Sequence, residues 1–250
     1  MTNILIIGQK SFVAKNFIFD FKDKFNFFYF QRYFKKNNKN YSIILENFIR
    51  NNKIKLILNF AGNNDNSFVN KDFEKILVSN FYLPITLLKL SDKLKIPLFL
   101  FLSKDMDNNN LLKNFYSISK NMLKSFIYNN NFKCKLRILN LDSLYGPYDL
   151  NYNRIFPSIF YNIYNKKKKK TNLYQIKNFT YVKDLNKILY KLIYKKDHFI
   201  YKNIKSDKIN ITKVYKLLIK NKNIDLKKKR IQYRSLFLTS EWYKKYYGKK

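Results

Sequence analysis

The first 140 residues alternate short apolar runs with amphipathic segments, and this alternation restricts the fold more than any other feature. Residues 4–7 form an apolar run that ends at Gly8, and helical periodicity follows over residues 11–21. Strands and helices repeated at such spacings indicate a parallel sheet with helices on both faces. Further strands are expected at 27–30, 55–60, 98–102 and 135–139, and helices at 42–50, 73–94 (with Pro84 inside it) and 112–128.

The pattern changes after Tyr145-Gly146-Pro147. A helix is expected at 154–164, a strand pair around 173–181, helices at 184–194 and 212–220, and a strand at 230–237. The lysine run at 166–170 is expected to be a solvated loop. We therefore predict an α/β fold with a doubly wound parallel Rossmann-type sheet and a small mixed C-terminal lobe. Residues 1–147 would form the sheet domain and residues 148–250 the lobe, with part of 178–200 returning to the first domain.

The formal net charge of +35 first suggests a nucleic acid or an anionic membrane as partner. Lysines are scattered through every segment, while the chain holds 4 glycines and 4 prolines. This distribution favours a compositional bias toward A/T-rich codons over a dedicated polyanion site. We expect no specific nucleic-acid partner, although the charge should attract a small anionic substrate.

Cys134 is the single cysteine of the sequence and His198 its single histidine. One cysteine excludes an intramolecular disulfide, and the two residues do not suggest a metal-binding cluster. We expect no metal, Cys134 in a partly buried position and His198 at the surface. The N-terminus lacks the features of a signal peptide, and no apolar run approaches the roughly 20 residues of a membrane span. A cytoplasmic location without membrane attachment is therefore expected.

The turn after the first strand carries small residues in the pattern of a dinucleotide fold. Gly8, Ser11, Phe12 and Val13 are the candidates to contact a pyrophosphate, because a close approach of backbone amides and a helix N-terminus suits that group. An ordinary turn is the alternative interpretation. The second strand is followed by Arg32 and not by an acidic residue, which favours NADP slightly over NAD.

The third strand ends in Asn59-Phe60-Ala61-Gly62, where small residues would let a cofactor pass closely. A simple turn is again the alternative. Asn80, in the next predicted helix, would either fix this turn through side-chain hydrogen bonds or lie exposed on the helix surface.

Tyr116 and Lys120 are four positions apart in a predicted helix, so both side chains project from one face. A phenol beside an ammonium is suited to exchange a proton with a carbonyl or an alcohol. The spacing alone is weak, because a chain with 21 tyrosines and many lysines produces it by chance. The pair is more significant than a chance match because it follows the predicted strand that ends at Ser103.

Taken in order, these segments resemble the extended short-chain dehydrogenase/reductases that modify nucleotide sugars. The resemblance covers roughly residues 3–195. It rests on Gly8-x-x-Ser11-Phe-Val-Ala14, Asn59-Phe-Ala61-Gly62, Phe99-Leu-Phe-Leu-Ser103, Tyr116-x-x-x-Lys120, Ser143-Leu-Tyr145-Gly146-Pro147-Tyr-Asp149 and Phe179-Thr-Tyr181-Val182-x-Asp184-Leu185.

The resemblance implies an NAD(P)-dependent epimerase, dehydratase or reductase acting on a nucleotide-linked sugar, in the synthesis of surface polysaccharide precursors. It makes Tyr116 the catalytic acid/base, and Lys120 the group that lowers the pKa of Tyr116 and holds the nicotinamide ribose. Ser103 would assist Tyr116, and Ser143 and Arg154 would bind substrate. It also implies that residues 1–147 form a dinucleotide-binding domain and residues 148–250 a substrate-binding lobe. A homodimer formed through the helices at 73–94 and 112–128 is implied as well.

Lys104 stands where the family has the Ser or Thr that hydrogen-bonds the reacting oxygen. Ser103 could substitute only if the strand end shifts by one residue. Lys104 therefore favours an alternative function, in which a catalytically degenerate member binds the dinucleotide as a binding or scaffold protein. Polyanion binding is a third hypothesis, which the even scatter of lysines disfavours.

Overall fold

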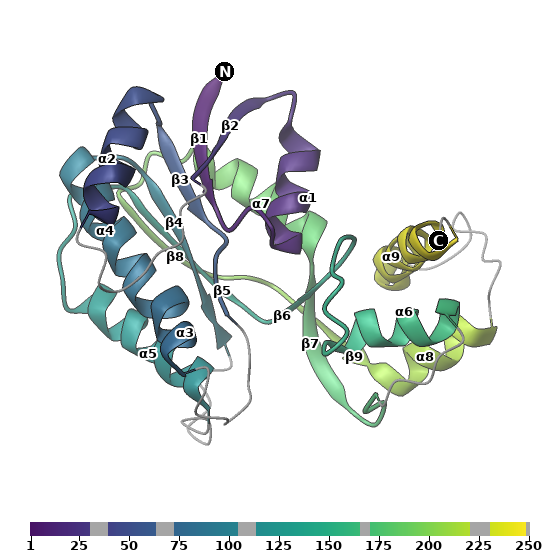
Figure 1. Ribbon diagram of the computed structural model, residues 1–250. Coiled ribbons are helices and arrows are strands. Elements are labelled where there is room, and N and C mark those ends of the chain that lie inside the picture. Colours follow the sequence, from purple (N-terminus) through teal and green to yellow (C-terminus); the bar gives the residue numbers. More distant parts are fainter. Residues whose placement is uncertain (31–39, 64–72, 105–113, 166–170, 221–230, 249–250) are drawn as a thin grey trace. The chain divides into compact units, whose positions relative to one another are not determined.

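The computed structural model describes residues 1–30, 40–63, 73–104, 114–165, 171–220 and 231–248 (Figure 1). Contacts divide the chain into two compact units. Unit 1 comprises residues 1–141 and 189–204, and unit 2 comprises residues 142–188 and 205–250. That unit 1 binds a dinucleotide and unit 2 a substrate stays a prediction.

Unit 1 contains a six-stranded sheet in which each pair of neighbouring strands is parallel. The order β2-β1-β3-β4-β5-β8 reverses direction between β1 and β3, as in doubly wound sheets. This confirms the predicted fold class. The strands are β1 (Thr2–Ile7), β2 (Phe25–Tyr29), β3 (Leu56–Asn59), β4 (Leu98–Ser103), β5 (Leu136–Leu141) and β8 (Phe199–Asn203).

Helices cover both faces of this sheet (Figure 1). On one face, Leu45, Leu87 and Leu123 of three different helices belong to one buried cluster with strand residues such as Leu100. On the other face, the ring of Phe17 lies 5.9 Å from that of Phe60. The first face carries α2 (Tyr41–Asn51), α4 (Leu83–Leu94) and α5 (Phe115–Tyr128), and the second carries α1 (Phe12–Phe21) and the C-terminal part of α7 (Val182–Ile193).

The helix expected over 73–94 is present but contains a π-helical turn. It consists of α3 (Phe73–Leu77), the π-helix η2 (Val78–Tyr82) and α4. The N–H of Leu83 donates to the carbonyl of Val78, five residues earlier. Pro84 lies in the first turn of α4, directly after the π-helical turn. The wide turn also places Asn80 in a fully buried position.

Unit 2 contains a small mixed sheet, which agrees with the prediction of a small mixed C-terminal lobe. Its order is β6-β7-β9, with β6 parallel and β9 antiparallel to β7. Tyr145, Phe156, Phe160 and Tyr243 belong to its core, and the rings of Phe160 and Tyr243 stack 4.6 Å apart. The elements are β6 (Ser143–Tyr145), α6 (Ile155–Asn165), β7 (Ile176–Tyr181), the start of α7, β9 (Asp207–Asn210), α8 (Ile211–Lys220) and α9 (Ile231–Tyr247).

Two predictions for unit 2 are wrong. The segment 230–237, expected to be a strand, begins the helix α9. Its buried residues Leu236, Ser240 and Tyr243 recur at helical spacing, which an eight-residue window does not reveal. The pair of strands expected around 173–181 is the single strand β7, whose partners β6 and β9 come from distant parts of the sequence. The loop expected at 166–170 lies outside the described residues.

Candidate active site at the carboxyl edge of the parallel sheet

The turn after β1 lies against the end of β3, where the strand order reverses. Gly8 has a φ of +82°, and a Cβ on it would stand 2.4 Å from the backbone nitrogen of Ala61. Only glycine fits such an approach at a positive φ. Ligands of doubly wound sheets bind in the crevice at this switch point, outside the carboxyl ends of the strands.

Helix α1 begins directly after this turn, with Ser11 as its N-cap. The Ser11 Oγ accepts the N–H of Ala14 at 3.1 Å, and the Ser11 N–H donates to the Gly8 carbonyl at 3.0 Å. The start of the helix is thereby fixed next to the carboxyl end of β1. The N-terminus of a helix favours anions through its amides and dipole, and both Phe12 and Val13 lie in this first turn.

Asn80 joins the segment after β3 to helix α5. Its Oδ1 accepts the N–H of Asn63 at 2.9 Å, and its Nδ2 donates to the Asn63 carbonyl at 2.7 Å and to the Ser119 Oγ at 3.1 Å. Ser119 in turn donates to the carbonyl of Tyr116 at 2.7 Å. Of the two interpretations of Asn80, the structure confirms that it fixes this turn and excludes exposure on the helix surface.

Helix α5 carries Tyr116 and Lys120 on one face, one turn apart. Asn114 caps the helix by accepting the N–H of Ser117 at 2.8 Å, so Tyr116 lies in the first turn. The Tyr116 side chain is partly buried and Lys120 is 7% exposed. The Lys120 Nζ donates to the Phe101 carbonyl of β4 at 2.9 Å, which fixes this face of α5 against the carboxyl half of β4.

Burial of Lys120 disfavours its ammonium form and lowers its pKa from 10.5 to about 8. At neutral pH the ammonium still predominates. The site therefore retains a cation that is poorly shielded by water, and such a cation interacts strongly with a neighbouring phenol or an anionic ligand.

Ser103 and Lys104 follow one another at the end of β4. Ser103 is the last residue of the strand and is buried, in register with Leu141 of β5. The Lys104 Nζ donates to the carbonyl of Ile204, just after β8, at 2.6 Å. The ammonium thus reaches across β5 to the end of the edge strand.

The two predicted substrate residues belong to unit 2. Ser143 is exposed in β6, and the Arg154 Nη1 lies 3.2 Å from the Asp149 Oδ2. Burial raises the pKa of Asp149, and the guanidinium of Arg154 opposes this rise. The motifs 143–149 and 179–185 meet in this unit, because Tyr145 pairs with Tyr181 and a Cβ on Gly146 would stand 2.3 Å from the Val182 Cγ1.

Most of the predicted cofactor and catalytic residues lie at one edge of the unit 1 sheet. Arg32 lies outside the described residues. Sequence reasoning did not identify Ser119 or the Phe101 carbonyl as part of the site. For Ser119, the only signal in the sequence was a small polar residue three positions after Tyr116. The residues at the shared edge are Gly8, Ser11, Phe12, Val13, Ala61, Gly62, Ser103, Tyr116 and Lys120.

The single histidine and the single cysteine do not belong to this group of residues. His198 is exposed, and its Nε2 lies 2.9 Å from the Lys133 carbonyl. Cys134 is buried, which raises the pKa of its thiol to about 11. Within the described ranges, no group of three His, Cys, Asp or Glu residues could hold a metal ion, and no helix is long and apolar enough to cross a membrane.

The profile of the NAD dependent epimerase/dehydratase family matches residues 37–205, about two thirds of the chain. The chain belongs to this family. The membership confirms the NAD dependent epimerase/dehydratase part of the resemblance inferred from the motifs. No curated protein matches the chain in sequence.

Solved structures of enzymes share the fold of this family member. A UDP-glucose 4-epimerase from Thermotoga maritima, crystallised with UDP-glucose, superposes with a TM-score of 0.76 at 13% identity, covering 98% of this chain and 99% of that one. A UDP-glucuronic acid 4-epimerase from Bacillus cereus in complex with NAD gives 0.76 at 15% identity, covering 100% and 99%. A dTDP-glucose 4,6-dehydratase from Streptomyces venezuelae with NAD bound gives 0.77 at 11% identity, covering 99% and 98%.

The contact between Gly8 and Ala61 predicts different outcomes for two glycine substitutions. Gly8→Ala places a Cβ 2.4 Å from backbone at a positive φ and should lower the free energy of unfolding by at least about 2 kcal/mol. Gly62→Ala is the matched control, because its Cβ would meet the Asn80 Oδ1 at an ordinary 3.4 Å. Urea denaturation of both variants measures the difference, and equal stabilities would contradict the close approach.

The lowered pKa of Lys120 predicts a pH-dependent stability. Between pH 8 and 10.5 the unfolded chain binds more protons at this group than the folded protein does, so stability rises with pH across this window. Relative to Lys120→Met, the parent protein should gain about 2 kcal/mol between pH 7 and pH 10. Urea denaturation of both proteins at the two pH values cancels the other titrating groups. A pH-independent difference would show that Lys120 is not buried as a charge.

Proposed function

We propose that the protein binds a nicotinamide dinucleotide at the carboxyl edge of the unit 1 sheet and transfers hydride at a carbon of a nucleotide-linked sugar. The proposal rests on one observation: three features suited to a dinucleotide lie at the same edge of the sheet. The Gly8 turn, the Ala61 turn and the buried Lys120 of α5, which donates to the Phe101 carbonyl of β4, all lie there. Family membership and the ligands named for the similar structures, NAD and UDP-glucose among them, support it.

The residues at the switch point fit a dinucleotide. Gly8 leaves no side chain over the turn, and α1 offers the positive end of its dipole to a pyrophosphate. The Ser11 hydroxyl accepts the Ala14 N–H and can still donate its own hydrogen. Gly62 is exposed and Ala61 is small, so a ligand can pass closely over the end of β3. Ser11, Phe12, Val13, Ala61 and Gly62 would hold the cofactor here.

The identity of the dinucleotide is open between NAD and NADP. Arg32, just beyond β2, would suit a 2′-phosphate and slightly favours NADP. The similar structures named with a nicotinamide cofactor contain NAD.

The cofactor supplies the hydride chemistry, and the chain must move the proton. Tyr116 is proposed to exchange the proton of the reacting hydroxyl. A nearby ammonium favours the phenolate, so Lys120 would lower the pKa of Tyr116 toward neutrality. An ammonium has three N–H donors, so Lys120 can retain the Phe101 carbonyl while holding a ribose hydroxyl. Ser103 would orient the reacting oxygen.

The substrate is proposed to be a nucleotide diphosphate sugar, used to make surface polysaccharide precursors. Arg154 would clamp the diphosphate, since its ion pair with Asp149 orients the guanidinium within unit 2, and Ser143 would contact the sugar. A homodimer through the long helices also remains a proposal, supported by the exposure of Met122 (38%) and Tyr128 (54%) on α5. A cytoplasmic location stays a prediction.

A second function is favoured by Lys104. If the ammonium bound to the Ile204 carbonyl replaces the hydroxyl that the reaction needs, the protein would bind the dinucleotide without turnover and act as a binding or scaffold protein. The two functions share the cofactor site and differ only in catalysis.

Cofactor binding and turnover are tested together with Tyr116→Phe. We expect NADH or NADPH to bind with a change in nicotinamide fluorescence, and UDP- or dTDP-linked sugars to be converted. Tyr116→Phe should reduce kcat by about 10²–10⁴-fold while the cofactor Kd changes less than about twofold. Tyr128→Phe, exposed on the same helix, is the control.

The possible results have different consequences for the two functions. Unchanged turnover in Tyr116→Phe would remove Tyr116 from the mechanism, and failure of both cofactors to bind would contradict both functions. Cofactor binding by a parent protein that converts no sugar nucleotide would favour the scaffold function.

A further inference from the structure

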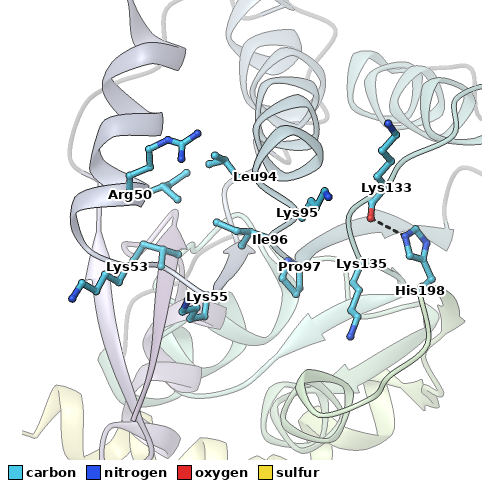
Figure 2. A pocket seen from close by; sticks show the side chains of 12 residues that line it. Arg50, Lys53, Lys55, Leu94, Lys95, Ile96, Pro97, Lys133, Lys135 and His198 are labelled. Atoms are coloured by element: carbon cyan, nitrogen blue, oxygen red, sulfur yellow. Dashed lines mark hydrogen bonds between the residues drawn. The ribbon is translucent and has the colours of Figure 1, made fainter.

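A cavity lies in unit 1, at the amino ends of the parallel strands. Its volume is about 770 Å³, within the range of sites for small ligands. The residues that line it lie at the C-terminal ends of helices α2 and α4 and in the segments just before β3, β4, β5 and β8 (Figure 2).

This cavity is separate from the proposed cofactor site. The cofactor site lies at the carboxyl ends of the strands, and the six residues of β4 alone span roughly 20 Å between the two edges. Ligands of doubly wound sheets bind at the carboxyl edge, so neither the fold nor the proposed reaction accounts for a cavity at the other one.

The lining is strongly cationic. None of the twelve lining residues carries a carboxylate, while six carry an ammonium or a guanidinium. Figure 2 shows these groups on two sides of the apolar residues Leu94 and Ile96. One side carries Arg50, Lys53 and Lys55, and the other carries Lys133 and Lys135 beside the imidazole of His198, with Lys95 between them.

Two carboxylates on the neighbouring helices are already engaged. Glu46 binds Arg50 at 2.9 Å and Lys93 at 2.7 Å. Asp92 accepts the backbone N–H groups of Lys133 and Cys134 with a single oxygen. Of these interactions, only the pair of Glu46 with Arg50 neutralises a side chain that lines the cavity, so the net charge of the lining remains positive.

Helix ends explain only part of this charge. Lys53 and Lys95 follow α2 and α4 with φ values of 49° and 53°, and a cation at a helix C-terminus gains about 0.3–1 kcal/mol from the helix dipole. Lys55 and Lys135 directly precede strands, where no such gain applies. The clustering of lysines from three successive helix-to-strand connections therefore points to an anionic ligand.

We propose that this cavity binds a compact oligophosphate anion, either free polyphosphate or the phosphate chain of a nucleotide. Several phosphates in one chain can contact cations on both sides of the cavity at once. The apolar residues Ile54, Ile96 and Pro97 between the cations would contact the non-phosphate part of a nucleotide. This site does not depend on the proposed catalytic function.

The test is titration calorimetry with inorganic tripolyphosphate in 0.15 M NaCl, where distant surface charges are largely screened. We expect one site per chain. The triple variant Lys53→Asn/Lys95→Asn/Lys135→Gln should bind at least tenfold more weakly, and asparagine tolerates the positive φ at the first two positions. All three side chains are exposed, so folding should be retained, as a melting curve can verify.

Two further triple variants serve as controls. Lys22→Gln/Lys89→Gln/Lys202→Gln removes the same charge from exposed positions of unit 1 outside the cavity and should change the affinity less than twofold. The substitutions Lys53→Arg/Lys95→Arg/Lys135→Arg keep the charge and should retain binding. If the neutralised Lys53/Lys95/Lys135 variant and the Lys22/Lys89/Lys202 variant lose equal affinity, tripolyphosphate binding reflects only the general positive charge of the protein. If the neutralised Lys53/Lys95/Lys135 variant loses no affinity, the anion binds elsewhere. Either result overturns the proposal.

ATP and an RNA oligonucleotide without a terminal triphosphate identify the source of the phosphates. ATP that binds more tightly than tripolyphosphate, with the gain lost in the cavity variant, assigns the site to a nucleotide. Equal affinities assign it to free oligophosphate. RNA that binds more tightly than both, and loses affinity only in the cavity variant, would overturn the proposal in favour of nucleic acid.

Discussion

The backbone of Gly8 lies against the backbone of Ala61, and the candidate site depends on that contact. It brings the ends of β1 and β3 together where the strand order reverses, and it places the start of α1 over the same edge. A side chain at position 8 would collide with the Ala61 backbone and push the turn after β1 away from the turn after β3. Ser11 contributes to this turn because its hydroxyl caps the helix, whereas no substitute exists at Gly8 itself.

Buried polar groups extend this edge to the helix that carries Tyr116. Asn80, in a π-helical turn, bonds to Asn63 on one side and to Ser119 on the other, so the segment after β3 and helix α5 are held by one side chain. Lys120 anchors the same helix to β4 through the Phe101 carbonyl. Burying an ammonium is costly, as its lowered pKa shows, and a purely structural role would be met by an apolar residue. The cost is explained if the charge acts on a ligand or on Tyr116.

The sequence predicted β1 to β5 of unit 1 because buried parallel strands are continuous apolar runs, as in residues 98–102. It also placed Tyr116 and Lys120 on one helical face, a property of spacing alone. Contacts between distant segments were not predictable. The partner of Lys104 is Ile204, 100 residues away, and β7 pairs with β6 and β9 from outside its own segment. The helix α9 was mistaken for a strand because its apolar residues extend beyond the short window considered. The cationic cavity was hidden because lysines that are scattered in sequence gather only in the fold.

A crystal structure of the protein with bound NAD or NADP tests the central claim, the cofactor site at the carboxyl edge, most directly. We predict the pyrophosphate over Gly8 and the first turn of α1, the nicotinamide ribose within hydrogen-bond distance of the Lys120 Nζ, and the Tyr116 hydroxyl beside the nicotinamide. The same structure would show whether Ser103 or Lys104 faces Tyr116. A dinucleotide bound at the amino edge of the sheet, or a nicotinamide remote from Tyr116, would contradict the proposed site.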